Sequence, residues 1–306
     1  MGQRAFIFPG QGSQEVGMGQ DLYAAEPAVR ALYDEAAAIL GFDLAQICFS
    51  GPEEELRQTR VTQPALYVHG YAMQRLLRAR GIVPQMLAGH SLGEFTAFAA
   101  AGALDFAAGL RLVQVRAEAM GRAAAQQPGI MAAILGLDFA ALAALCREAG
   151  AVGSVAIANF NSPGQLVISG SRPGVERAIE LALAAGARRV IPLAVSGAFH
   201  SALMAPAQSD LRQALLEAPF AEPEAPVYCN VTAEPCSGIA EIRRLLEEQL
   251  THPVLWAAQI ERMVAAGANQ FIEIGPGRVL AGLVKKIAPE VEVCAAGRLL
   301  DLEHFA

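Results

Sequence analysis

One serine stands between two glycines in the segment Gly89-His90-Ser91-Leu92-Gly93. The G-x-S-x-G pattern is typical of a nucleophile elbow, a sharp turn from a strand into a helix on which a serine hydroxyl is held in a strained conformation. Side chains two residues before and after the serine would collide there, so both positions need glycine. Because the pattern is short, a glycine-rich turn with an idle serine is the alternative interpretation.

A nucleophilic serine needs a general base, for which histidine is the usual residue. His90 adjoins the serine, so its side chain should leave the turn in another direction. His200 lies in a loop of small residues, 196–201, that directly follows a predicted strand. This position suits a general base, although a hydrogen-bonded structural histidine would fit it as well. The other histidines are His69, His252 and His304.

A hydrolase-type triad would also need an acid between the serine and the histidine in chain order. Every acid considered there is explained as a helix cap, a first-turn acid or an exposed helix residue. These acids are Glu94, Asp105, Glu118, Asp138, Glu148, Glu176 and Glu180. The residues therefore predict a Ser–His dyad whose histidine is oriented by something other than a carboxylate.

The elbow needs a strand before it and a helix after it, and hydrophobic periodicity predicts both, at 83–88 and 94–101. The same alternation of strands and helices runs through the first and last parts of the chain. It predicts an α/β domain with a largely parallel sheet. The further predicted strands are 4–8, 227–231 and 270–274, and the further helices are 24–40, 64–80, 109–125, 204–216, 239–250 and 279–287.

The middle of the chain has a different order of elements, β-α-β-β-α-β, which is that of a ferredoxin-like unit. Its predicted strands are 130–136, 155–159, 166–169 and 189–193, and its predicted helices are 138–148 and 172–185. We therefore expect an inserted small domain at 126–194. The larger catalytic domain, hydrolase-like in its elbow, would comprise 1–125 and 195–306.

Composition narrows the class of protein. Of 306 residues, 54% are apolar and 17% charged, which favours a well-packed enzyme over a disordered chain. A net charge of −7 argues against a nucleic-acid partner. The five scattered cysteines include no C-x-x-C pair, so we expect neither a disulfide framework nor a zinc site. We also expect the protein to reside in a reducing compartment. No signal peptide, myristoylation pattern or membrane-spanning run is evident, which predicts a soluble cytoplasmic protein.

Seven motifs extend the argument along nearly the whole chain. Together they resemble those of malonyl-CoA:acyl carrier protein transacylases and of the acyltransferase domains of polyketide synthases. The motifs are FPGQGSQ at 8–14, TQPAL at 62–66, GHSLGE at 89–94, ANFNSPGQLVISG at 158–170, GAFHS at 197–201, QL at 249–250 with PVLW at 253–256, and EIGPGRVL at 273–280. The resemblance implies a hydrolase-like α/β domain with a ferredoxin-like insertion, as read from the elements above.

The resemblance also implies catalytic roles. Ser91 would be acylated by malonyl-CoA, and His200 would take its proton and pass it to the leaving thiolate. The backbone N–H groups of Gln11 and Leu92 would form an oxyanion hole, which explains why the loop at 8–14 has no bulky side chain before Gln11. Gln249 would orient His200 through its backbone carbonyl, in place of the missing carboxylate.

Five residues would bind the substrate. Arg116 matches the family's carboxylate-binding arginine, since a guanidinium can hold the malonyl carboxylate with two parallel hydrogen bonds. From the residues alone a surface arginine on an ordinary helix is equally compatible. Gln63 and Asn161 are candidates for the pocket wall, although they can also be a helix-start residue and a turn former. His90 and Phe199 match the malonyl-selective form of the family.

The resemblance implies malonyl-CoA as substrate and a phosphopantetheinylated acyl carrier protein as partner, with no metal, no tightly bound cofactor and no membrane. An acidic carrier would need a basic patch to dock on this acidic chain. The candidate clusters are Arg57 with Arg60, Arg75 with Arg78 and Arg80, Arg188 with Arg189, and Arg278 with Lys285 and Lys286, of which Arg188–Arg189 and Lys285–Lys286 are favoured.

Three alternatives to a transferase of fatty-acid synthesis remain. A freestanding acyltransferase that serves a polyketide synthase would use the same chemistry with another carrier. An acyl-thioester hydrolase would use water as acceptor, but such an enzyme has no use for the clamp that Arg116 provides. A non-catalytic scaffold with a vestigial site would not need the whole set of Gln11, Ser91, Arg116 and His200.

Overall fold

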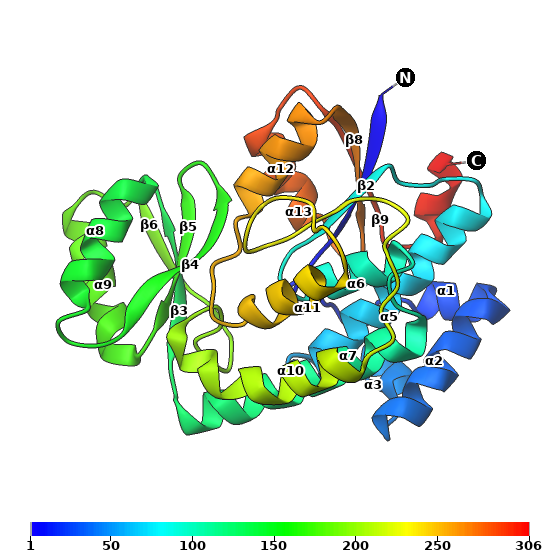
Figure 1. The fold of residues 1–306 in the computed structure, drawn as a ribbon, viewed down its shortest axis with the longest axis horizontal. Coiled ribbons are helices and arrows are strands. Elements are labelled where there is room, and N and C mark those ends of the chain that lie inside the picture. The colour runs from blue at the N-terminus through cyan, green and yellow to red at the C-terminus, as the bar shows by residue number, and fades with distance from the viewer. Residues whose placement is uncertain (1, 306) are drawn as a thin grey trace.

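The computed structural model describes residues 2–305, which form a parallel sheet and a separate antiparallel sheet (Figure 1). The parallel sheet has the strand order β7-β2-β1-β8-β9, and every neighbouring pair in it is parallel. Its strands are β1 (Gln3–Phe8), β2 (Met86–Gly89), β7 (Val227–Tyr228), β8 (Ala268–Ile274) and β9 (Glu292–Ala296). This is the predicted α/β class with a parallel sheet.

Both faces of the parallel sheet are covered, which explains the continuous apolar run of its central strand. Phe6 and Phe8 of β1 pack into one core cluster with residues of α5 (Thr59–Ala79), α6 (Leu92–Ala100) and α7 (Phe106–Gln126). Ala5 and Ile7 point to the other face, against α12 (Trp256–Ala265) and α13 (Val279–Ile287). Successive side chains of a strand point to opposite faces of the sheet, so the side chains of β1 contribute to two separate cores.

The antiparallel sheet has the strand order β4-β5-β3-β6 and stands to one side of the larger body, at the left of Figure 1. Its strands are β3 (Ile130–Leu135), β4 (Val155–Ser162), β5 (Gln165–Gly170) and β6 (Arg189–Pro192). The helices α8 (Phe139–Ala149) and α9 (Arg172–Ala184) pack on it and complete the predicted β-α-β-β-α-β order. The domain limits at 125/126 and 194/195 stay a prediction.

The remaining helices belong to the larger body. They are α1 (Gln20–Ala25), α2 (Pro27–Leu40), α3 (Leu44–Ser50), α4 (Glu53–Leu56), α10 (Gln208–Glu217) and α11 (Ile239–Glu248), with the 3-10 helices η1 (Ala202–Ala207) and η2 (Leu299–Phe305). Among the helices between residues 2 and 305, none combines the length and the apolar character that crossing a bilayer requires.

Several elements differ from the prediction. The helix expected at 24–40 is two helices, because Glu26 is extended before Pro27. The helix expected from Pro64 begins at Thr59, so Pro64 lies inside it. The helices α3, α4 and α12 and the edge strand β9 were not predicted. The strand expected at 227–231 ends at Tyr228, because the chain turns back on itself, with Cys229 and Glu234 hydrogen-bonded through their backbones.

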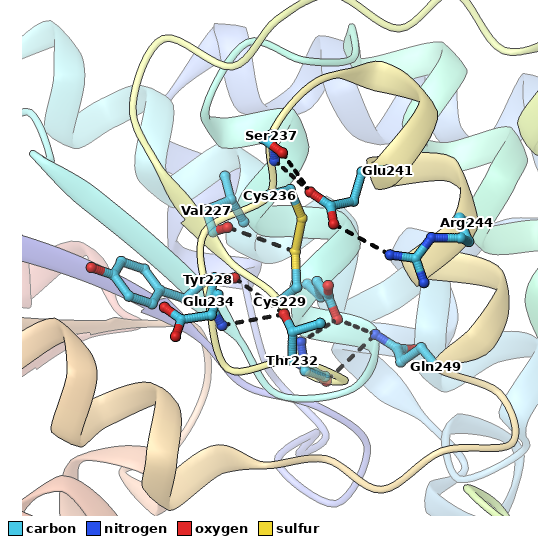
Figure 2. Close-up of a disulfide and its surroundings, with 12 residues drawn as sticks. Val227, Tyr228, Cys229, Thr232, Glu234, Cys236, Ser237, Glu241, Arg244 and Gln249 are labelled. Carbon is cyan, nitrogen blue, oxygen red and sulfur yellow. Dashed lines mark hydrogen bonds and ion pairs between the residues drawn. A yellow bond between two sulfur atoms is a disulfide. The ribbon is translucent and has the colours of Figure 1, made fainter.

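That turn overturns one expectation about the cysteines. Cys229 and Cys236 form a disulfide that joins the end of β7 to the segment before α11 (Figure 2). A spacing of seven residues carries no recognisable signal, and the pair meets because the turn brings Pro235 opposite Tyr228. Cys48, Cys146 and Cys294 are free.

Candidate active site

The segment around Ser91 has the geometry of a nucleophile elbow. It joins β2 to α6, and Ser91 itself has φ 54° and ψ −110°, a conformation that a non-glycine residue rarely adopts. A Cβ atom on Gly89 would overlap the backbone of Gly93, and one on Gly93 would overlap the carbonyl oxygen of Phe8. The steric requirement that the sequence indicated is therefore met on both sides of the serine.

His200 lies directly against the serine. Its Nε2 is 2.8 Å from Ser91 Oγ, and its Nδ1 is 2.8 Å from the backbone oxygen of Gln249 and 3.2 Å from that of His252. With Nδ1–H donating to these carbonyls, Nε2 is left to accept the serine proton. Burial, with a smaller contribution from the Arg116 charge, lowers the pKa of His200 to about 3. The imidazole is therefore neutral, as a base must be.

Arg116 points inward and is 1% exposed, so the surface interpretation is wrong. Its guanidinium donates to Gln63 Oε1 at 2.6 Å, to Gln249 Oε1 at 2.8 Å and to Ser91 Oγ at 3.1 Å. It also lies over the ring of Phe95, 5.4 Å from the centroid. Burial lowers the pKa of Arg116 to about 10, which still leaves it charged at neutral pH.

The loop at 8–14 approaches the elbow closely. A Cβ on Gly10 would come 2.5 Å from the carbonyl oxygen of His90, so this position also requires glycine. Leu92 is the first residue of α6, whose N-terminal N–H groups have no partner within the helix. Within residues 2–305, the backbone N–H groups of Gln11 and Leu92 form no hydrogen bond.

These residues line a cavity of about 260 Å³, whose walls include the loops that follow β1 and β2 and strands of the antiparallel sheet. Met131 and Val167 come from the antiparallel sheet, opposite the elbow. The predicted residues on the lining are Gln11, Gln63, His90, Ser91, Leu92, Arg116, Asn161, Phe199 and His200. His90 and Asn161 are linked at 2.9 Å, between His90 Nε2 and Asn161 Oδ1. Burial lowers the pKa of His90, so this histidine is neutral too.

Two residues beside the site were missed. Asn230 is fully buried, and its side chain accepts from Ser91 N–H at 2.7 Å and donates to the Gly89 carbonyl at 2.6 Å. Glu94, read from the sequence as an ordinary helix acid, is fully buried and accepts from Gln249 Nε2 at 2.5 Å. A signal for Glu94 existed, since it is the lone carboxylate in an apolar helix, whereas nothing in the sequence marks Asn230.

Comparisons with known proteins show to which family the chain belongs. The family model described as "Acyl transferase domain" matches residues 5–299. The chain belongs to the acyl transferase family. It is an acyltransferase enzyme, and the family resemblance carried by the seven motifs is confirmed. Among residues 2–305, no group of His, Cys, Asp or Glu side chains has the arrangement needed to hold a metal ion.

Individual members of the acyl transferase family are similar over their whole length. A malonyl CoA-acyl carrier protein transacylase of Bacillus subtilis is 45% identical, over 96% of this chain and 93% of the relative. The structure of an acyl carrier protein S-malonyltransferase from Vibrio cholerae is 42% identical with a TM-score of 0.96, covering 99% and 100%. A chain in the structure described as a type II PKS acyl-carrier protein in complex with its malonyl-transacylase is 42% identical, with a TM-score of 0.96. The match covers 99% of this chain and 98% of that chain.

Proposed function

We propose that this enzyme transfers a malonyl group from malonyl-CoA to the phosphopantetheine thiol of an acyl carrier protein, through a malonyl-serine intermediate, in fatty-acid synthesis. The observation that carries the proposal is the convergence of two groups on one hydroxyl. Ser91 Oγ contacts the neutral base His200 at 2.8 Å and the cation Arg116 at 3.1 Å. A substrate with a reactive thioester and a free carboxylate uses both groups. The names of the relatives support this choice of substrate.

In the first half-reaction, Ser91 Oγ attacks the thioester carbonyl carbon while His200 Nε2 takes the serine proton. The negative charge that develops on the carbonyl oxygen would be stabilised by the N–H groups of Gln11 and Leu92. The carbon–sulfur bond then breaks, and His200 returns the proton to the CoA thiolate. The products are a malonyl ester on Ser91 and free CoA thiol, with His200 neutral again.

The second half-reaction is the reverse sequence with a different thiol. His200 takes the proton of the phosphopantetheine thiol, whose sulfur attacks the malonyl ester. The tetrahedral intermediate collapses, the bond to Ser91 Oγ breaks, and His200 protonates the serine. Gln249 supports both steps, because its backbone oxygen keeps His200 Nδ1 protonated and the ring in place. No redox step or metal is needed.

Arg116 would hold the malonyl carboxylate in both half-reactions. Its two terminal nitrogens are already aimed by Gln63 and Gln249, so the guanidinium is fixed before the substrate arrives. His90, braced by Asn161, and Phe199 would form the wall beside the malonyl methylene.

Carrier docking would use cations that have no acidic partner. Arg57, Arg60 and Arg78 form ion pairs with Glu53, Glu55 and Glu224, so their charge is largely compensated. Within residues 2–305, the exposed side chains of Arg188, Arg189, Lys285 and Lys286 form no ion pair. We propose these as the dock. Lys286 is the best placed of them, since its Nζ contacts Gln165 on the cavity lining at 3.1 Å.

The dock can be tested by charge reversal in Lys286→Glu, with Arg57→Glu as the matched control. The Lys286 variant should slow transfer to the carrier, most of all at low salt, and leave acylation by malonyl-CoA intact. Equal slowing of both half-reactions would show that Lys286 is not part of the dock.

A second candidate is the same transfer to the carrier of a polyketide synthase, which the similarity to the type II PKS complex favours. A general acyl-thioester hydrolase is a weaker candidate, because a substrate without a free carboxylate gives no function to the buried Arg116. Comparing transfer rates to a fatty-acid and a polyketide carrier protein distinguishes the two transferase functions.

Intact-mass measurement tests the chemistry itself. Incubation with malonyl-CoA should add one malonyl group, the Ser91→Ala variant should gain none, and addition of holo-carrier should remove the group from the wild type. An adduct that forms but is lost rapidly to water would indicate the hydrolase. Complete absence of an adduct on folded wild-type protein would refute the proposed function.

A further inference from the structure

Glu94 and Arg116 are connected through one amide group. Gln249 Nε2 donates to Glu94 Oε2 at 2.5 Å, while Gln249 Oε1 accepts from Arg116 at 2.8 Å. The backbone N–H of Asn230 also donates to Glu94 Oε2, at 3.3 Å. Glu94 thus lies one side chain behind the residue proposed to hold the substrate carboxylate, in a place where water does not reach it.

Within residues 2–305, no carboxylate forms a direct ion pair with Arg116, so the bridged Glu94 is the acid that acts on its charge. The other oxygen, Oε1, is buried and has no hydrogen-bond partner in the described part of the chain. Glu94 can therefore gain or lose a proton on Oε1 without breaking its contacts to Gln249 and Asn230. Two charge states are compatible with one geometry.

We propose that Glu94 is a positioning residue whose protonation state sets how strongly Arg116 attracts the malonyl carboxylate. Neutral Glu94 leaves the Arg116 cation uncompensated and ready for a carboxylate from the substrate. Ionised Glu94 compensates that cation through Gln249 and competes with the substrate. This inference rests on the proposed function, since it deepens the role given there to Arg116.

The charges around Glu94 permit this switch near neutral pH. Burial, partly offset by Gln249, Asn230 and Arg116, raises the pKa of Glu94 to about 8. The buried titratable groups of the site and of the elements packed on α6 do not change charge between pH 7 and 9. The pKa values of the histidines are lowered and those of the tyrosines raised, and Arg116 remains charged; these groups are His69, His90, His200, Tyr67, Tyr228 and Arg116.

The test is the KM of serine loading between pH 7 and 9, for wild type and Glu94→Gln, with malonyl-CoA and acetyl-CoA. Glutamine keeps the oxygen that accepts from Gln249 and cannot ionise. The wild-type KM for malonyl-CoA should rise up to about tenfold over this range, with little change in kcat, because ionisation follows pH above the folded pKa. In Glu94→Gln the KM for malonyl-CoA should change less than about twofold over this range. The KM for acetyl-CoA should also change less than about twofold, in both proteins.

A second measurement does not depend on the folding of Glu94→Gln. Calorimetry in two buffers of different ionisation enthalpy measures the protons taken up when a ligand binds to Ser91→Ala at pH 8. Binding of malonyl-CoA should take up about half a proton, and binding of acetyl-CoA should take up none. A malonyl KM that rises equally in wild type and Glu94→Gln, or binding without proton uptake, overturns the inference about Glu94 alone. Absence of any malonyl adduct at pH 7 overturns the proposed function and this inference together.

Discussion

Replacing Asn230 by alanine removes the two hydrogen bonds that its side chain forms with the backbone of the elbow. The side chain bridges the residue before His90 and the residue after it, with 2.6 Å to the Gly89 carbonyl and 2.7 Å from Ser91 N–H. Gly89 is buried and the Ser91 N–H points at the buried Asn230 side chain, so the alanine variant leaves both backbone groups without this partner. We expect this single change to lower both the stability of the protein and the rate of serine loading.

The magnitude follows from the number of groups left unpaired. Each buried polar group that loses its partner costs about 1–3 kcal/mol, so the two groups together give about 2–6 kcal/mol. The unfavourable conformation of Ser91 stores about 1–3 kcal/mol, which the elbow can release once Asn230 no longer restrains it. Relaxation would move Ser91 Oγ away from His200, and a displacement of about 1 Å can slow loading about 100-fold.

Urea unfolding and the rate of malonyl-serine formation by mass spectrometry measure the two effects. Asn269→Ala, at an exposed position, is the control. If Asn230→Ala stays within about 0.5 kcal/mol of wild type and loads within about twofold of it, Asn230 does not hold the elbow.

Three further predictions concern neighbouring groups. Arg116→Ala should depress loading from malonyl-CoA far more than from acetyl-CoA, and equal losses in the loading assay would show that Arg116 is not the clamp. The pKa of His200 is lowered to about 3, so this base becomes protonated only at lower pH than an ordinary histidine. We therefore expect kcat/KM for acetyl-CoA to stay level from pH 7 to about 5. A fall in kcat/KM centred near pH ~6.5 would contradict this. Cys236→Ser removes the disulfide with Cys229. Measured by urea unfolding without reductant, the free energy of unfolding should fall by about 2 kcal/mol. No difference from wild type would show that the disulfide does not stabilise the fold.

Much of the fold follows from local patterns. The strands and helices around the elbow, the β-α-β-β-α-β order and the parallel sheet all come from hydrophobic periodicity and from glycine and proline positions. Prediction was weakest where long-range contacts decide the structure. The short strand β7 is limited by the turn at Cys229, and the edge strand β9 exists because β8 offers it a pairing partner.

The candidate site divides in the same way. The sequence by itself determined the elbow at Ser91, since the clash that two glycines avoid is local, and it pointed to His200 and to the lack of a triad acid. Only the tertiary structure decided that Arg116 faces inward, that Asn230 brackets the elbow and that Glu94 lies behind Gln249. These contacts join residues 25 to 155 positions apart. Steric clashes between residues close in the sequence can be predicted from the sequence. Contacts between distant residues depend on how the helices pack on the sheet.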